Sequence, residues 1–206
     1  MPVPTSREQS ERRDTRSRLV DAAASLFSRH GYAATGVKAV LTAAGAPYGS
    51  LYHFFPEGKQ QLGVAVLERG GDFYRAMVES FYPPGVDVRD ATAASFAGAA
   101  ELLVATDYAD ACPIATIALE VASSDEPMRE AAASAFGSWL DVLEERFTTA
   151  GMEPERARDV AVELFCLIEG AFLLARTTRS VAAVHVAGRA ATAAVAAGLA
   201  DGGGAR

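Results

Sequence analysis

The segment from residue 31 to residue 59 constrains this chain more than any other, because it predicts two short helices joined by a glycine turn. The first helix is expected over residues 37–44, with Thr35 as its N-cap, because a threonine hydroxyl can accept a bond from an amide of the first turn. Gly45 is expected to end it, since glycine tolerates the left-handed backbone that stops a helix. This is the layout of a DNA-reading helix-turn-helix.

The second helix of this motif is expected over residues 46–54, because proline is tolerated in a first turn and Pro56 stops the run. Polar tips would remain exposed beside its apolar side chains, and they suit phosphates and base edges. We predict base contacts by Lys38, Tyr48 and Ser50. Phosphate contacts are predicted for Thr35, Tyr52, His53 and Lys59. The predicted DNA-binding set is Thr35, Gly36, Lys38, Pro47, Tyr48, Ser50, Tyr52, His53 and Lys59.

Several residues of this segment resemble the TetR family of one-component transcriptional regulators in order and spacing. They are Gly31-Tyr32, Thr35, Ala44-Gly45, Leu51-Tyr52-His53-Phe54-Phe55 and Lys59. The resemblance covers about the first 60 residues. Two further segments, Pro56-Glu57-Gly58-Lys59 and Cys112-Pro113-Ile114-Ala115, look like the branch typified by LmrA and YxaF. The resemblance implies an operator-binding head and a helical body that encloses a small-molecule pocket.

The remainder of the chain predicts further helices, because apolar residues recur at helical spacing and strand-like alternation is absent. Helices are expected over residues 15–30, 59–81, 88–106, 113–123, 126–150, 153–176 and 181–199. The fold class is therefore all-α, with a DNA-binding domain over 13–58 and an effector-binding and dimerisation domain over 59–200. The first dozen residues and the tail 201–206 are expected to be unstructured. The pair Gly70-Gly71 marks either a bend or a point of close packing.

Charge is unevenly distributed along the chain. Residues 1–60 hold eight Lys or Arg and five Asp or Glu, whereas residues 61–206 hold eleven against twenty-one. A basic head on an acidic body is expected if only the head meets phosphate. A chance surface imbalance is the alternative, but the asymmetry coincides with the predicted helix-turn-helix.

No pattern in the chain indicates catalysis, a metal site or a cofactor. The histidines are isolated, and Cys112 and Cys166 predict buried, reduced thiols, with a redox switch as the alternative. No signal peptide is visible, so the expected location is the cytoplasm. Arg189 interrupts the apolar stretch 181–200 and argues against a membrane span.

Aromatic and soft apolar residues are scattered over the expected helices of the body. An ordinary helical core explains such residues, but under the TetR resemblance some of them line a pocket instead. Glu120, Glu169 and Thr116 could orient a ligand in this apolar cavity, whereas a solvated helix face explains each glutamate equally well. The predicted ligand-binding set is Phe73, Met77, Phe96, Cys112, Thr116, Phe136, Trp139, Phe165 and Glu169. Few fixed charges favour a flat aromatic or otherwise lipophilic ligand, and the resemblance implies flavonoid-like or antibiotic-like effectors.

The last two long helices carry apolar faces that need a partner, either within one subunit or in a second copy. Two symmetric heads would read a palindrome with half-sites about one helical turn apart. We therefore predict a homodimeric repressor that binds double-stranded operator DNA through residues 13–58 and is released by a small effector. The competing interpretations are an architectural DNA-binding protein without a ligand and a small helical enzyme.

Overall fold

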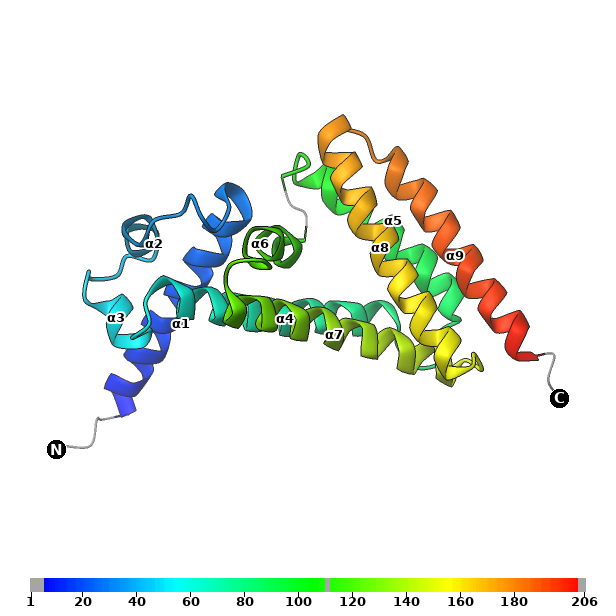
Figure 1. Ribbon diagram of the computed structural model, residues 1–206, viewed down its shortest axis with the longest axis horizontal. Helices are drawn as coiled ribbons and strands as arrows, with labels where there is room; N and C mark the ends of the chain where they lie inside the picture. Colours follow the sequence, from blue (N-terminus) through cyan, green and yellow to red (C-terminus); the bar gives the residue numbers. More distant parts are fainter. Residues whose placement is uncertain (1–5, 110–111, 204–206) are drawn as a thin grey trace. The chain divides into compact units, whose positions relative to one another are not determined.

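The computed structural model describes residues 6–109 and 112–203, and this part of the chain contains helices and no strand (Figure 1). The helices are α1 (Ser6–His30), α2 (Val37–Ala43), α3 (Ser50–Phe54), α4 (Lys59–Phe81), α5 (Val88–Ala105), α6 (Pro113–Val121), α7 (Glu126–Thr149), α8 (Pro154–Thr178) and α9 (Ala182–Gly203). The predicted all-α class is confirmed, and α4 has the predicted bounds.

The structure differs from the prediction at the two ends of the described chain. Helix α1 begins at Ser6, so residues 6–12, expected to form an unstructured arm, are helical. Helix α9 continues to Gly203, which places the first half of the expected tail in a helix. Residues 1–5 and 204–206 lie outside the described part of the chain.

Contacts divide the chain into two compact units. The first, called here the head unit, comprises residues 1–70 and 113–132, and the second, the body unit, comprises residues 71–112 and 133–206. The predicted boundary between residues 58 and 59 does not coincide with this division. Helix α6 packs against α1 and therefore belongs with the head, although 82 residues separate the two helices in the sequence.

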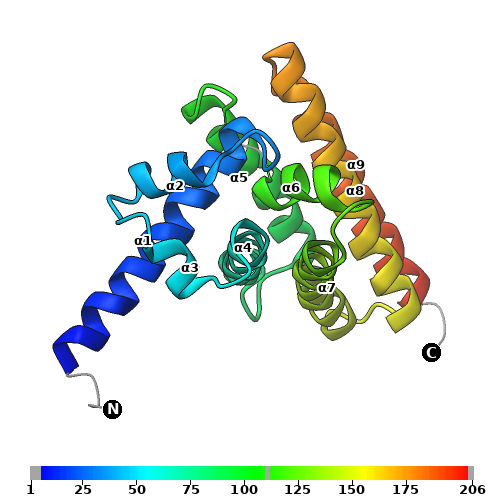
Figure 2. The same cartoon turned by 60° about the vertical axis from the view of Figure 1, so that its left-hand side comes forward.

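The core of the head unit lies where α1 meets α2, α3 and α6 (Figure 2). Its large, fully buried side chains include Leu19, Val20, Phe27, Leu51, Phe55, Ile114 and Ile117. Arg18 adds a polar connection, because its Nε donates to the carbonyl of Ala44 at the end of α2, at 3.1 Å. That carbonyl is one of the orphan acceptors at a helix C-terminus.

The turn between α2 and α3 depends on Gly45, whose φ of +58° is in the left-handed region. Its amide bonds to Thr42 O at 3.2 Å, and the amide of Ala46 bonds to Leu41 O at 3.0 Å. This pair of bonds is a Schellman motif, which ends a helix and reverses the chain sharply. The glycine predicted to end the first helix therefore does so.

In the body unit, α9 packs against both α5 and α8. The close approach to α5 requires Gly188, because a Cβ there would lie 2.8 Å from Phe96 Cβ. By length and composition, Ala182–Asp201 is apolar enough to cross a membrane. Its packing against two neighbouring helices is that of a core helix in a folded domain.

The Gly70-Gly71 pair in α4 is a point of close packing. A Cβ at Gly70 would lie 2.7 Å from Ile114 Cδ1, within the head unit. A Cβ at Gly71 would lie 2.9 Å from Ala135 Cβ, within the body unit. Larger residues would force these helices apart. Close packing therefore explains why two glycines stand inside a helix despite their cost in helix stability.

Candidate functional site

The second helix of the helix-turn-helix is shorter than predicted. Helix α3 begins at Ser50, whose amide bonds to Pro47 O at 2.9 Å across a tight turn. Residues 46–49 therefore precede the α-helix instead of forming its first turn. Pro47 is compatible with this turn because it donates no amide there.

One side of this motif is buried and the other carries exposed polar and aromatic groups. Leu51 is fully buried, whereas Tyr48 is 73% exposed and Tyr52 is 54% exposed. Gly36, Lys38, Pro47 and His53 are also exposed, and Ser50 is half-buried. Eight of the nine predicted DNA-binding residues are thus at least partly accessible to solvent, and their contacts with DNA remain predictions.

Thr35 is the exception, because it is buried and its hydroxyl is used inside the protein. Its Oγ1 donates to Gly31 O at 2.7 Å, and its amide bonds to Tyr32 O at 3.2 Å. The N-cap of α2 is Gly36, which makes no side-chain cap bond. The predicted N-cap at Thr35 is wrong, because its side chain holds the turn after α1. The phosphate contact proposed for Thr35 stays a prediction.

Lys59 is half-buried at the start of α4 and lies against the same turn. Its Nζ is 4.2 Å from the centre of the Tyr32 ring and donates to Ala33 O at 3.4 Å. Burial lowers the pKa of this ammonium, and the nearby Glu120 carboxylate opposes that shift. The ammonium therefore connects α4 to the end of α1.

Glu120 completes this arrangement, and the sequence prediction missed its role. Its carboxylate accepts the amide of Tyr32 at 2.9 Å and that of Ala33 at 2.7 Å. A carboxylate that accepts two backbone amides is a strong charge-assisted contact. Glu120 therefore does not belong to the pocket of the body unit, and it joins α6 to the turn after α1.

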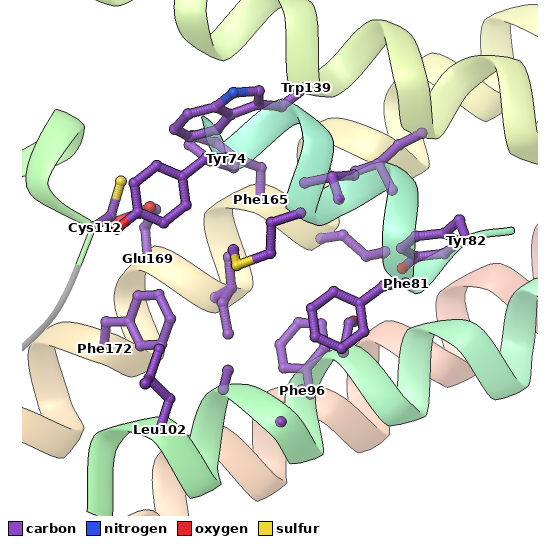
Figure 3. A pocket seen from close by; sticks show the side chains of 18 of the residues that line it. Tyr74, Phe81, Tyr82, Phe96, Leu102, Cys112, Trp139, Phe165, Glu169 and Phe172 are labelled. Carbon is purple, nitrogen blue, oxygen red and sulfur yellow. The ribbon is translucent and has the colours of Figure 1, made fainter. Parts of the chain in front are cut away.

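The body unit contains a pocket of about 240 Å³, formed by α4, α5, α7, α8 and Cys112 (Figure 3). Its walls are almost entirely apolar. The aromatic lining residues are Tyr74, Phe81, Tyr82, Phe96, Trp139, Phe165 and Phe172. Roughly 150 Å³ suffices for benzene in an engineered apolar cavity, so this volume accommodates a substituted aromatic ring.

Six predicted ligand-binding residues line this pocket, namely Met77, Phe96, Cys112, Trp139, Phe165 and Glu169. The prediction missed the row formed by Tyr74, Val78 and Phe81 on α4. Their spacing of four and three residues places them on one face of the helix, a pattern that the sequence does contain. Ligand binding by these residues remains a prediction.

Three predicted residues lie elsewhere. Phe73 is 65% exposed and does not line the pocket, although its ring centre lies 5.2 Å from that of Tyr74. Thr116 belongs to α6 in the head unit. Phe136 packs behind the pocket wall, with its ring centre 5.4 Å from that of Trp139 and 5.1 Å from that of Phe165.

Hydrogen bonds fix the orientation of two aromatic walls. The Trp139 indole Nε1 donates to Gly71 O at 2.8 Å. The Tyr82 hydroxyl lies 3.0 Å from Thr92 Oγ1, which already donates to Val88 O, so Tyr82 is the donor. Burial raises the pKa of Tyr82. Both rings are therefore held in place without a ligand.

Glu169 is the acidic side chain of the pocket wall, and Cys112 lies beside it. Apolar burial raises the pKa of Glu169, while a hydrogen bond from the Cys112 thiol partly opposes this shift. Cys112 is buried and Cys166 is exposed, and neither forms a disulfide. The prediction of a buried thiol is therefore wrong for Cys166, which lies on the outer side of α8.

Comparison with known proteins gives consistent matches for both parts of the chain. The family described as "Bacterial regulatory proteins, tetR family" matches residues 19–66. The family described as "Transcriptional regulator LmrA/YxaF-like, C-terminal domain" matches residues 89–190.

Individual relatives agree with these matches. An uncharacterized HTH-type transcriptional regulator of Mycobacterium tuberculosis, Rv0196, is 36% identical over 80% of this chain and 85% of its own. The HTH-type transcriptional regulator LmrA of Bacillus subtilis is 29% identical over 81% of this chain and 89% of its own. The reduced form of E. coli NemR superposes with a TM-score of 0.75 at 25% identity, covering 86% of this chain and 95% of that one.

Proposed function

Because this chain belongs to the TetR family of bacterial transcriptional regulators, we propose that it is a homodimeric repressor whose palindromic operator is released when a small apolar or aromatic effector binds. The observation that carries the proposal is the apolar pocket in the body of a chain that also has a helix-turn-helix. The relatives matched here are transcriptional regulators, and the chain is not an enzyme. We propose that the protein acts in the cytoplasm, where operator DNA is located.

The effector would act by shifting populations. It must bind the conformation that is unable to hold DNA more tightly than the competent one, and it can shift the balance only by that difference. The polypeptide itself links the pocket to the head unit, because Cys112 lines the pocket and the next residue, Pro113, begins α6. Helix α6 in turn carries Glu120, which binds the turn after α1.

A second copy of the chain would cover apolar surface on the last two helices. On α8, Val162 is 42% exposed and Leu173 is 66% exposed, on the side opposite the core. On α9, Val186 is 57% exposed and continues into exposed alanines at positions 190, 193 and 197. Small residues at this spacing allow close helix approach, which supports a four-helix dimer interface.

An architectural DNA-binding protein is the alternative. It would share the head but would have no need of a pocket with aromatic walls held by hydrogen bonds. The body unit is also acidic, with sixteen Asp or Glu against nine Lys or Arg, which disfavours wrapping by DNA.

The decisive experiment fills the pocket and leaves the head intact. An operator is first selected from random duplexes, and aromatic compounds, starting with quercetin, are screened for those that raise the melting temperature and release this operator. Ala99→Trp should then keep operator affinity but abolish release, because Ala99 lines the pocket. Ala97→Trp, on the exposed side of the same helix, is the matched control and should respond normally.

Two results would contradict the proposal. One is that no compound that stabilises the protein changes operator affinity, which would favour the architectural alternative. The other is that Ala99→Trp responds as well as Ala97→Trp, which would place the effector outside this pocket.

A further inference from the structure

The charge of the pocket wall is one-sided. Among the lining residues within the described ranges 6–109 and 112–203, Glu169 is the only Asp or Glu, and none is Lys, Arg or His. An anionic ligand would therefore find no counter-ion among these residues. The body unit as a whole carries an excess of acidic residues, which favours the approach of cations.

Glu169 has a weak partner in the protein. A thiol is a poor hydrogen-bond donor, and a bond from the Cys112 thiol supports this carboxyl. The basic side chain nearest to it along α8, Arg176, is directed elsewhere, because its guanidinium donates to Tyr108 O at 3.2 Å and to Ala109 O at 3.3 Å. A ligand that fills the pocket with apolar atoms alone would remove water from this carboxyl without supplying a hydrogen bond or an opposite charge, which is unfavourable.

Aromatic rings line the same pocket. The ring centres of Tyr74 and Trp139 are 5.6 Å apart, and those of Trp139 and Phe165 are 5.9 Å apart. Figure 3 shows Glu169 and Cys112 together at one side of the pocket, away from Phe81 and Tyr82. Rings of this kind attract organic cations through their negative faces, with Trp the strongest of them.

We propose that the pocket binds a lipophilic organic cation, with the Glu169 carboxylate as its counter-ion and the rings of Tyr74, Trp139 and Phe165 around the charged group. This inference rests on the proposed function, because it names the chemical class of the effector for the same pocket. A neutral aromatic compound can fill the apolar side of the pocket, but it leaves Glu169 without a charged partner.

The test uses two molecules of the same shape. Benzyltrimethylammonium carries a positive nitrogen where neopentylbenzene carries a neutral carbon, so their difference in affinity isolates the charge. Trp139 is the only tryptophan of the chain, and its fluorescence therefore reports occupancy of this pocket in the full-length protein.

Wild-type protein should bind benzyltrimethylammonium at least about tenfold more tightly than neopentylbenzene, as expected for a contact to a charged group. Glu169→Gln, which keeps the shape and removes the charge, should abolish this preference. Glu169→Asp should retain it, although more weakly. The control Glu163→Gln removes an exposed carboxylate from the same helix and should change neither affinity.

Three outcomes would overturn the inference. If neopentylbenzene binds and the cation binds no better, the pocket takes ligands but Glu169 is not a counter-ion, and the proposed function stands. If Glu169→Gln weakens both compounds equally, the carboxyl shapes the pocket instead of choosing charge. If neither compound changes the Trp139 fluorescence, the cation assignment fails together with this pocket as the effector site.

Discussion

The Glu120 carboxylate accepts the backbone amide of Tyr32 at 2.9 Å, across 88 positions of sequence. It also accepts the adjacent amide of Ala33, so one side chain of α6 satisfies two donors that follow the end of α1. These amides lead directly into the helix-turn-helix. Glu120 therefore connects the α6 segment to the DNA-reading motif by polar contacts, in addition to the apolar packing of the two helices.

Replacement of Glu120 by Ala should destabilise the head unit by about 1 kcal/mol, because both amides lose a charged acceptor that is partly screened by solvent. Operator affinity should fall with it, since the turn before α2 is freed. Thermal denaturation and fluorescence anisotropy measure the two effects. Glu68→Ala, at an exposed glutamate of the same unit, is the control. Equal behaviour of the two variants would show that the contact has no consequence.

Lys59→Ala should weaken binding to all DNA sequences. It should also reduce the slope of log affinity against log salt concentration by about 1, as expected for the loss of one phosphate contact. Its ammonium is close enough to the Tyr32 ring and Ala33 O to be held in position for such a contact. The measurement is operator affinity against salt concentration, with Arg75→Ala in the body unit as control. A lower melting temperature with an unchanged slope would restrict Lys59 to a structural role.

Tyr48→Ala should weaken binding to the selected operator more than binding to random DNA. Tyr48 is 73% exposed in the turn before α3, where its ring can meet a thymine methyl group. Competition between the two duplexes gives the ratio of affinities directly. An equal loss on both would assign Tyr48 to the DNA backbone. Because Tyr48 has little buried surface, its removal should leave the melting temperature nearly unchanged.

Trp139→Leu should reduce the effector's ability to release the operator while leaving DNA binding largely intact. It removes a pocket wall and the bond to Gly71 O. Phe136→Leu is the informative comparison, because Phe136 contacts Trp139 from behind and does not line the pocket. Both variants should lower the melting temperature, but only Trp139→Leu should lose the response. A normal response in Trp139→Leu would refute its place in the effector site.

Val186→Glu should shift the protein from dimer to monomer, because a charge in an apolar helix interface lacks a partner. The control is Val104→Glu on α5, since the two valines are each 57% exposed in the body unit. Light scattering after size-exclusion chromatography gives the mass of each variant. If neither variant dissociates, the dimer interface does not include Val186 in the first turns of α9. Dissociation should also abolish binding to the palindrome at low protein concentration.

The sequence predicted the helices well because their limits are set locally. The bounds of α4 follow from a glycine turn before Lys59 and the Pro83-Pro84 pair after Phe81. The reversal at Gly45 was likewise predictable, since few other residues adopt its backbone. Thr35 was misjudged because a threonine before a helix can cap it or bond backward, and only the fold decides between the two.

The pocket was predicted in part, for a reason that Phe73 and Tyr74 illustrate. Both are aromatic and adjacent, yet Tyr74 lines the pocket and Phe73 is exposed. Composition does not distinguish them, and the face of α4 that becomes internal depends on which helices pack against it. Glu120 is a similar case, because its partners are backbone amides that any sequence would supply.

The discontinuity of the head unit bears on how such regulators can be recombined. A fragment that ended at residue 58 would leave behind Lys59, Glu120 and the whole of α6. A hybrid regulator that borrows this DNA specificity would therefore have to carry two separate stretches, residues 1–70 and 113–132, into the new host. If the body unit binds the effector as proposed, exchange of residues 71–112 and 133–206 would change the effector specificity and leave the DNA specificity unchanged. The unit to transfer is the set of residues that contact one another in the head, which is not one continuous stretch of the sequence.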